Sequence, residues 1–355
     1  MTRIIVLGGR GFFGRAVVEL LRLDGGRPLV ASRRPGADLL IDAEDAVSVG
    51  AALKAGDVVI DTSGPFQRRS TLLVETAIAT GCSVIDISDS LDYACKIQQI
   101  ARRINGVNDA RVLTSCSAVS AVSAALVRHL DVPEPVRISA FLAPAVRHTA
   151  TAGTTWSLFS SLERPIRVLR AGALVERRAF TEERAFHFPS PVGPVSAGLC
   201  ESPDAVTLPL IWSTLRDVDL RVDTRSRWVN ALCRSAADQR SVRAVTRTLL
   251  PIARSAAKWF GATSGGFDVE VEDRSGARVA AGFVHATRSY LVAVAPAVLA
   301  ANAIAAGTFE GCGLVRADRY VDAGRLVDYL RRTGVEFFTS PPHPHPLPRS
   351  GKIDL

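Results

Sequence analysis

Short apolar runs alternate with segments of helical spacing along the first third of the chain. A run without helical period predicts a buried strand, and such runs occur at 3–7, 29–32, 39–42, 57–61, 83–87 and 110–114. Between them, apolar residues at helical spacing predict helices over 15–23, 71–79 and 91–104. Because strands that alternate with helices pair in parallel through helical crossovers, this pattern predicts an α/β domain with a doubly wound parallel sheet.

From about residue 136 the alternation gives way to shorter strands. We expect a strand at 137–141, a helix at 154–162, and further strands around Val168 and at 185–188, 219–222, 267–271 and 279–284. The last two flank Glu272-Asp273-Arg274-Ser275-Gly276, a connection typical of a hairpin. Strands and hairpins that follow a parallel sheet predict an inserted α+β domain containing an antiparallel sheet.

The apolar segment 289–307 raises the question of a membrane span. Pro296 divides it, so we expect a buried strand at 290–295, a helix that starts at Pro296, and no stable membrane insertion. A further helix is predicted at 324–331. We expect both helices to return to the first domain.

The charge balance bears on the ligand, and the cysteines bear on the cellular compartment. The formal net charge is +8 and the pI about 9.6, and nearly all the positive charge comes from scattered arginines. Because no polybasic run occurs, we expect no nucleic-acid partner, and an acidic ligand such as a phosphorylated cofactor suits this balance better. The six cysteines form no Cys-x-x-Cys pair, and without a signal peptide a cytoplasmic location with free thiols is expected.

A glycine-rich loop joins the first predicted strand to the first predicted helix. It reads Gly9-Arg10-Gly11-Phe12-Phe13-Gly14, a Gly-x-Gly-x-x-Gly motif in the context that binds dinucleotides. We expect Gly9 to permit the tight turn, Gly11 to let the backbone approach a pyrophosphate, and Gly14 to let helix and strand pack closely. The free N–H groups of the helix start would then face the phosphates.

The end of the second predicted strand indicates which dinucleotide is bound. An acidic residue at this point takes the ribose hydroxyls of NAD, whereas an arginine accommodates the 2′-phosphate of NADP. Here the strand ends in Ser32-Arg33-Arg34, and the nearest carboxylate downstream is Asp38. The sequence therefore predicts NADP as the cofactor, with the Arg33 and Arg34 side chains at the phosphate and the adenine.

Polar residues follow the other predicted strands as well. The carboxyl ends of parallel strands share one edge of a sheet, where the ligand of such a fold binds. We therefore expect the cofactor to contact the residues at the ends of the third and fourth strands: Asp42, Thr62, Ser63, Gly64, Pro65 and Phe66.

Three segments of the chain together resemble the saccharopine dehydrogenase-like family. They are Ser63-Gly64-Pro65-Phe66, Leu73-Val74-Glu75-Thr76-Ala77 and Gly81-Cys82-Ser83-Val84-Ile85-Asp86-Ile87-Ser88-Asp89. The spacing of Ala295-Pro296-Ala297-Val298 and Gly307 is similar to the family's closing segment. The resemblance implies an NADP-binding Rossmann domain, an α/β domain inserted before the final helices, and a homodimer formed through that insertion.

We accordingly expect four parts. Residues 1–132 form the Rossmann domain, 133–295 the substrate and dimerisation domain, 296–340 the C-terminal helices, and 341–355 a disordered proline-rich tail. The chain departs from the lysine-pathway members after the sixth strand. Their Gly-x-Asp-Pro-Gly type turn is replaced by residues 115–120, so saccharopine itself is not the expected substrate.

Other enzyme classes find little support in the sequence. A short-chain reductase needs a Tyr with a Lys four residues later, and none of the four tyrosines has one. Neither a Gly-x-Ser-x-Gly elbow nor a His-x-x-x-His pair occurs, so we expect no hydrolase nucleophile and no metal site.

Hydride transfer also needs a group that gives or takes a proton where the charge of the substrate changes. Asp86 and Asp89 follow the fifth strand, with Tyr93 one helical turn beyond, and each could equally cap the strand end or helix start. His148 and His187 could reach across from the second domain or be structural. We predict an NADP-dependent oxidoreductase acting on a carbon–nitrogen or carbonyl group of a small metabolite; the alternative is a non-enzymatic NADP-binding sensor.

Overall fold

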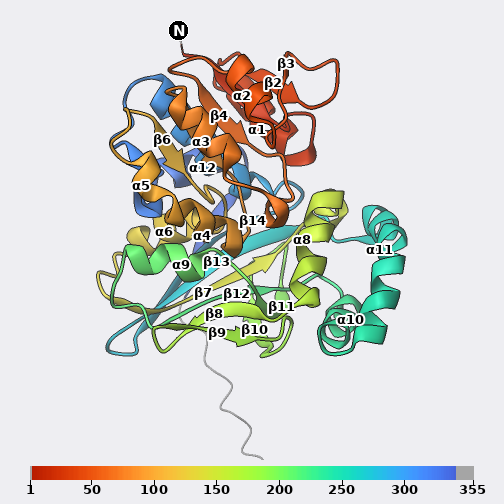
Figure 1. Ribbon diagram of the computed structural model, residues 1–355. Coiled ribbons are helices and arrows are strands. Elements are labelled where there is room, and N and C mark those ends of the chain that lie inside the picture. Colours follow the sequence, from red (N-terminus) through yellow and green to blue (C-terminus); the bar gives the residue numbers. More distant parts are fainter. Residues whose placement is uncertain (1, 341–355) are drawn as a thin grey trace, which may run out of the picture.

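The computed structural model describes residues 2–340, in which two sheets lie one above the other (Figure 1). The first is a seven-stranded parallel sheet of order β15-β6-β5-β4-β1-β2-β3, so the predicted doubly wound sheet is confirmed. Its strands are β1 (Ile4–Leu7), β2 (Leu29–Ser32), β3 (Leu39–Leu40), β4 (Val58–Asp61), β5 (Ser83–Asp86), β6 (Arg111–Leu113) and β15 (Gly313–Leu314).

Helices cover both faces of this sheet, which is why its strands read as continuous apolar runs. Val6 and Ile60 face a core shared with α1, α6 and α12, whereas Ile5 and Val59 face a second core with α2, α3 and α4. The helices are α1 (Phe12–Leu23), α2 (Ala46–Ala52), α3 (Leu72–Ala79), α4 (Leu91–Gln99), α5 (Ala101–Ile104), α6 (Ala121–His129), α12 (Leu291–Ala305) and α13 (Ala323–Arg332).

The second sheet is nine-stranded, with main order β10-β11-β12-β7-β13-β14-β16, and β8 pairs with β12 and β9 at its side. Most neighbours are antiparallel, as expected of the inserted domain, but β7 and β12 pair in parallel, so the sheet is mixed. The strands are β7 (Pro135–Ala143), β8 (Ile166–Arg170), β9 (Ala173–Arg177), β10 (Arg184–His187), β11 (Pro194–Cys200), β12 (Asp217–Val222), β13 (Gly265–Asp273), β14 (Arg278–His285) and β16 (Glu336–Ser340).

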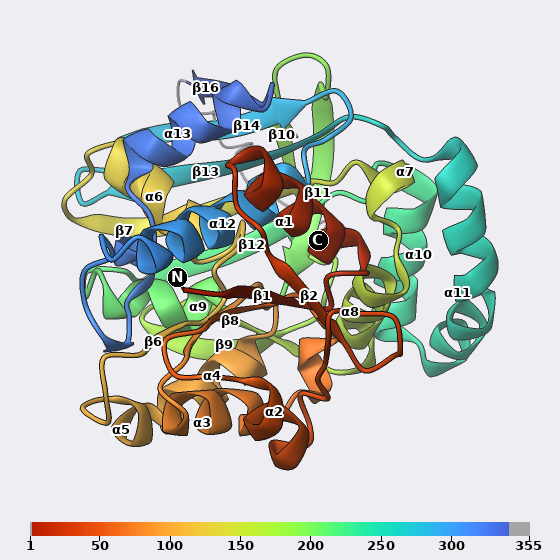
Figure 2. The ribbon, with the colours of Figure 1, turned by 90° about the horizontal axis from the view of Figure 1, so that it is seen from above.

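Helix α12 corrects the expectation of a strand at 290–295. The segment is helical from Leu291, and Pro296 lies inside the helix. Figure 2 shows α12 between the first sheet and β13. Side chains around the whole circumference of this helix are buried. A helix that is buried on all sides has no polar stripe, so its sequence lacks the helical period that would have identified it.

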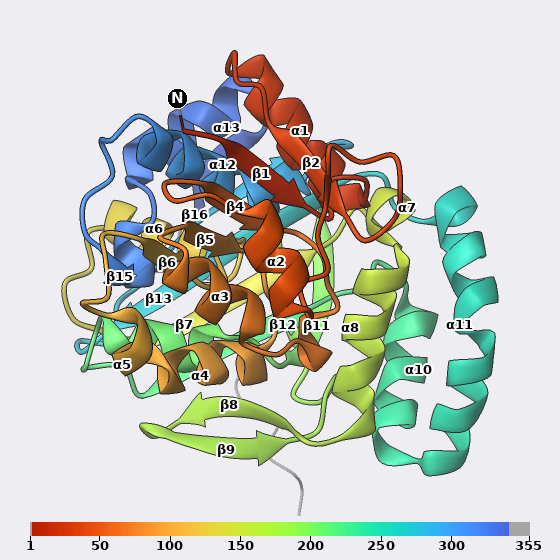
Figure 3. The same ribbon diagram turned by 45° about the horizontal axis from the view of Figure 1, so that its top comes forward.

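An antiparallel pair of helices at the side of the inserted domain was not predicted. Helices α10 (Arg227–Asp238) and α11 (Arg240–Phe260) lie side by side, beyond α8 (Ala152–Glu163) as seen from the sheets (Figure 3). The short helices α7 (Val146–Thr149) and α9 (Asp204–Thr207) and the strands β9, β11 and β16 were not expected either. In the first domain, helices α2 and α6 and strand β15 were not predicted. Strand β16 extends the second sheet, although α13 before it packs on α12 and α6.

The division at residues 132 and 295 into separate units stays a prediction. The inserted segment begins with β7 at Pro135, and the expected disordered tail 341–355 lies outside the described residues. Among the helices of residues 2–340, none combines the length and apolar character that crossing a bilayer requires.

Candidate functional site

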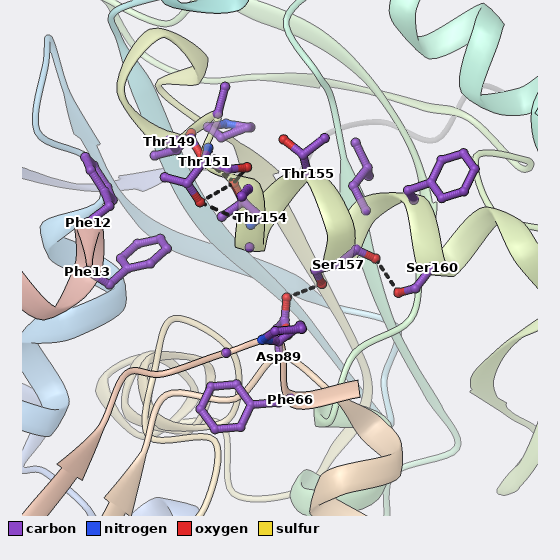
Figure 4. Close-up of a pocket in the computed structure, with 18 of the residues that line it drawn as sticks. Phe12, Phe13, Phe66, Asp89, Thr149, Thr151, Thr154, Thr155, Ser157 and Ser160 are labelled. Atoms are coloured by element: carbon purple, nitrogen blue, oxygen red, sulfur yellow. Dashed lines mark hydrogen bonds between the residues drawn. The ribbon is translucent and has the colours of Figure 1, made fainter. Parts of the chain in front are cut away.

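A cleft of about 1740 Å³ runs along the carboxyl ends of the first sheet and continues between the inserted domain's helices. One end is lined by the glycine-rich loop and the loops after β2 and β4, and the other by α8, α10 and α11. Figure 4 shows Phe12 and Phe13 on one side, Phe66 and Asp89 below, and the hydroxyl-bearing start of α8 opposite.

Close backbone approach explains the glycines of the loop. A Cβ built on Gly14 would lie 2.2 Å from the Gly8 carbonyl oxygen, so α1 reaches the loop only with glycine there. The positive φ that makes the tight turn belongs to Gly8, at 76°, and not to Gly9 as the sequence suggested. Gly9 instead packs beside Val30, where a Cβ would meet a methyl group at 3.1 Å. Gly8 is therefore a residue that the motif alone did not identify.

The residues expected to bind the cofactor gather at one end of the cleft. Gly9 and Gly14 lie behind the loop surface and shape it, and the others line the cleft itself: Arg10, Gly11, Phe12, Phe13, Ser32, Arg33, Arg34, Asp42, Thr62, Ser63, Gly64, Pro65 and Phe66. A Cβ on Gly11 would meet only the Gly8 carbonyl oxygen within 4 Å, at 3.1 Å, so this backbone faces open space. Such a cradle of exposed backbone fits a pyrophosphate.

Cationic side chains surround the end of β2. Arg33 and Arg34 are exposed and line the cleft, and Arg10 donates a hydrogen bond to the Pro35 carbonyl oxygen at 2.9 Å. The nearest carboxylate, Asp38, accepts the Val30 N–H at 2.8 Å and is not among the residues that line the cleft. Asp42 and Glu44 also line this end, but Glu44 pairs with Arg69, so the three arginines leave it with a net positive charge that suits a 2′-phosphate.

A buried ion pair holds the wall after β4. The Asp61 carboxylate is fully buried and lies 3.1 Å from the Arg69 guanidinium, which also donates to the Ser63 carbonyl oxygen at 2.7 Å. The Thr62 hydroxyl donates to the Leu7 carbonyl oxygen at 2.8 Å and ties the wall to β1. Sequence reasoning missed Arg69, whose only signal was its proximity to the strand end.

Asp89 is the predicted acid–base candidate that faces the cleft. It is exposed, and its carboxylate accepts hydrogen bonds from the Ser157 hydroxyl and, at 3.1 Å, from the Gln67 amide (Figure 4). Gln67 also donates to Ser157 at 2.9 Å, so the three side chains connect the first domain to α8. Asp89 is thus placed where a bound molecule could touch it.

Asp86 and Tyr93 lie beneath the cleft wall and do not line it. The Asp86 carboxylate accepts the Ser115 and Ser88 N–H groups at 2.8 and 3.0 Å through one oxygen, and its other oxygen has no hydrogen-bond partner. Burial raises the pKa of Asp86 to about 7, although those N–H groups oppose the shift. Tyr93 is buried, with its hydroxyl unpartnered. Both side chains support the loops from below.

We expect Asp86→Asn to stabilise the protein above pH 7. The folded protein retains a proton that the unfolded chain releases between about pH 4 and 7, so ionisation of Asp86 reduces stability as the pH rises through this window. Asparagine can keep the accepting oxygen without the charge. Urea unfolding should give a gain on the order of 2–4 kcal/mol at pH 8 and little change at pH 4. The exposed Asp328→Asn is the control, and equal pH profiles for Asp86→Asn and wild type would contradict the assignment.

The two candidate histidines do not join the site. His148 belongs to α7, and its buried Nε2 has no hydrogen-bond partner, but its neighbours Val146 and Thr149 line the cleft while it does not. His187 is exposed on β10, at the edge of the second sheet. Among residues 2–340, no group of three or more His, Cys, Asp and Glu side chains is placed to hold a metal ion.

The loop between β6 and α6 is held by a residue that the sequence did not reveal. Asp204 of α9 is fully buried and accepts hydrogen bonds from the Ser120 N–H and, at 3.0 Å, from the Ser123 hydroxyl. The loop's Ser117, Ala118 and Val119 line the cleft. The inserted domain therefore fixes one wall of the first domain's ligand site, a contact between residues some eighty positions apart that no local pattern signals.

Comparison with known proteins supports this description at the level of the fold. No family model matches the sequence, and no curated protein does. The structure is similar to that of apo saccharopine dehydrogenase (L-Glu forming) from Saccharomyces cerevisiae, with a TM-score of 0.62 and 12% identity over 96% of this chain and 100% of the other. The chain thus has a saccharopine dehydrogenase-like fold, as the sequence predicted.

Two other solved structures are more distantly similar. A mutant of meso-dapdh from Clostridium tetani, solved with DAP, has a TM-score of 0.46 at 13% identity, covering 94% of this chain and 99% of the other. Amine dehydrogenase from Mycobacterium smegmatis also has a TM-score of 0.46, at 10% identity, covering 90% and 96%.

Proposed function

We propose that the protein is an NADP-dependent oxidoreductase that transfers a hydride to or from a carbon–nitrogen or carbonyl group. The observation that carries the proposal is the single cleft in which the glycine-rich loop, the Ser32-Arg33-Arg34 turn and Asp89 all take part. The loop suits the pyrophosphate, and the arginines suit the 2′-phosphate. The saccharopine dehydrogenase-like fold supports the same proposal.

The chain's own residues would bind and orient both reactants. The backbone at Gly11 and the wall at 62–66 hold the cofactor, whose nicotinamide supplies the hydride chemistry when bound. Asp89, bonded to Ser157 and Gln67, stands at the junction of the two domains. There its carboxylate would give or take the proton that accompanies hydride transfer.

Asp89→Asn is expected to reduce kcat about a hundredfold with little change in NADPH affinity, because it removes the group that would give or take the proton but no cofactor contact. Ser157→Ala is the matched variant, since it removes the hydrogen bond that the Ser157 hydroxyl donates across the domains and keeps the carboxylate. Steady-state kinetics of the two variants distinguish the role of Asp89 in proton transfer from its role in the hydrogen bond to Ser157. Equal losses in Asp89→Asn and Ser157→Ala would mean that Asp89 only positions α8.

The experiment that tests the proposed function begins with the ligands retained by the purified protein. Mass spectrometry of these ligands identifies a candidate metabolite, which is then supplied with NADPH or NADP while the absorbance of the reduced nicotinamide is followed. An enzyme changes this absorbance at a rate proportional to protein concentration. A sensor would bind NADPH without turnover, which would favour the alternative function. The homodimer and the cytoplasmic location stay predictions.

A further inference from the structure

The far end of the cleft differs in character from the cofactor end. Between α8 and the α10–α11 pair, the lining is apolar and forms what we call the hairpin groove: Leu158, Leu232, Leu249, Leu250, Ala253 and Phe260. On α11 the lining residues recur every three or four positions from Thr246 to Phe260, so they share one face of the helix. At 1.5 Å per residue this face is roughly 20 Å long.

The groove leaves apolar side chains uncovered. Leu232 is 42% exposed, Leu249 45% and Phe260 89%, although all three lie on the face that lines the cleft. Exposed apolar surface on a folded domain is typical of protein or membrane contacts and of ligand-binding grooves, and here it lines the same cleft as Asp89. A ligand with apolar surface of its own would bury these side chains.

The charges beside the groove comprise one ion pair and two further arginines. Arg164 pairs with Glu201 at 2.9 Å, and Arg225 donates to the Val192 carbonyl oxygen at 2.9 Å. Arg254 is the fourth charged side chain of this lining among residues 2–340. The remaining polar groups are mainly the hydroxyls of α8, such as Thr154, Thr155 and Ser160, which can contact a neutral molecule as readily as a charged one.

The hairpin groove is continuous with the part of the cleft where Asp89 stands at the junction of the two domains. Ser157 bonds to Asp89, and its neighbour Leu158 already lines the groove. The whole cleft, about 1740 Å³, exceeds the roughly 300–1,000 Å³ that a single small ligand usually occupies. It can therefore hold a dinucleotide at one end and a second, elongated molecule at the other.

We propose that the substrate carries a long apolar chain, which lies in the hairpin groove with its carbonyl or imine carbon beside Asp89. The identity of the reacting group rests on the proposed function. The proposal of an apolar chain depends on the groove alone, so the reacting group and the apolar chain can be disproved separately.

The test measures binding by calorimetry for three methyl ketones of increasing length: acetone, methyl hexyl ketone and methyl decyl ketone. If the alkyl chain of the ketone lies in the hairpin groove, the Kd of the ketone should fall as this alkyl chain lengthens, by up to about fourfold per methylene. Ala253→Trp should fill the groove and remove most of this dependence. Leu249→Glu, at a half-exposed position that need not affect folding, should also weaken the longest ketone most.

Ala244→Trp is the matched control, because Ala244 is exposed on α11 and does not line the cleft. It should retain the full dependence on chain length. Equal affinities of the wild type for the three ketones, or the same length dependence in Ala253→Trp and Ala244→Trp, would overturn the inference. NADPH titration of the same variants separates the two proposals. If ketone affinity rises with ketone length but NADPH does not bind, only the proposed function is rejected. If NADPH binds but ketone affinity does not change with length, only the groove proposal is rejected.

Discussion

Gly11→Val is expected to weaken NADPH binding by about 10²–10⁴-fold while the protein stays folded. The Gly11 backbone has φ of −73° and ψ of 176°, which any residue adopts, and its side-chain position points into the open cleft. A valine there fills the space of the pyrophosphate and prevents backbone N–H groups from donating to it. Losing two charged hydrogen bonds of roughly 1.5–3 kcal/mol each gives a loss of this size.

Fluorescence titration with NADPH measures the effect, and thermal unfolding shows whether the variant is folded. Gly50→Val, on an exposed face of α2 away from the cleft, is the control for a glycine-to-valine change in the same domain. Gly14→Ala should behave differently and lower stability, because its Cβ would clash with the Gly8 carbonyl oxygen. A folded Gly11→Val protein with wild-type NADPH affinity would disprove the pyrophosphate site.

Replacing Arg33 and Arg34 together by alanine is expected to weaken NADPH binding by about 10²–10⁴-fold and NADH binding far less. Both side chains line the cleft, and the Arg34 N–H hydrogen bond to the Ser32 hydroxyl, at 3.1 Å, orders the turn that carries them. A charged hydrogen bond to the 2′-phosphate corresponds to a preference of about ten- to a hundredfold for each arginine. NADH lacks this phosphate, so the ratio of the two affinities is the measured quantity.

A charge-matched control separates specific contacts from the net positive charge. Arg22→Ala with Arg27→Ala removes two exposed arginines of the same domain that do not line the cleft. This control should leave the ratio of NADPH to NADH affinity unchanged. If the Arg33/Arg34 variant lost affinity for both cofactors equally, the arginines would act through general electrostatics and not through the 2′-phosphate.

Most strands of the first sheet were predictable because the local signal of each matched its tertiary role. Strands such as 58–61 are buried on both faces, so they appear as unbroken apolar runs, and the glycine motif sits where a strand meets a helix. Helix α12 was misread for the same reason, since complete burial removes the period that distinguishes a helix from a strand. The α10–α11 pair was missed although both helices are strongly amphipathic, so the sequence does carry the helical period that identifies them.

The candidate catalytic site was less predictable because it depends on where neighbouring side chains point. Asp86 and Asp89 lie three residues apart after one strand, yet the first turns inward to the Ser115 N–H and the second faces the cleft. Ser157 and Asp204, which tie the inserted domain to these loops, come from elements far along the chain. Such contacts arise only when both domains are assembled.

Calorimetric titration of the wild-type protein with NADPH and with NADH shows whether the cleft is an NADP site. We expect one site that binds NADPH at least about tenfold more tightly than NADH, because the arginines at the end of β2 meet a phosphate that only NADPH carries. Tighter binding of NADH, or binding of neither nucleotide, would contradict this expectation.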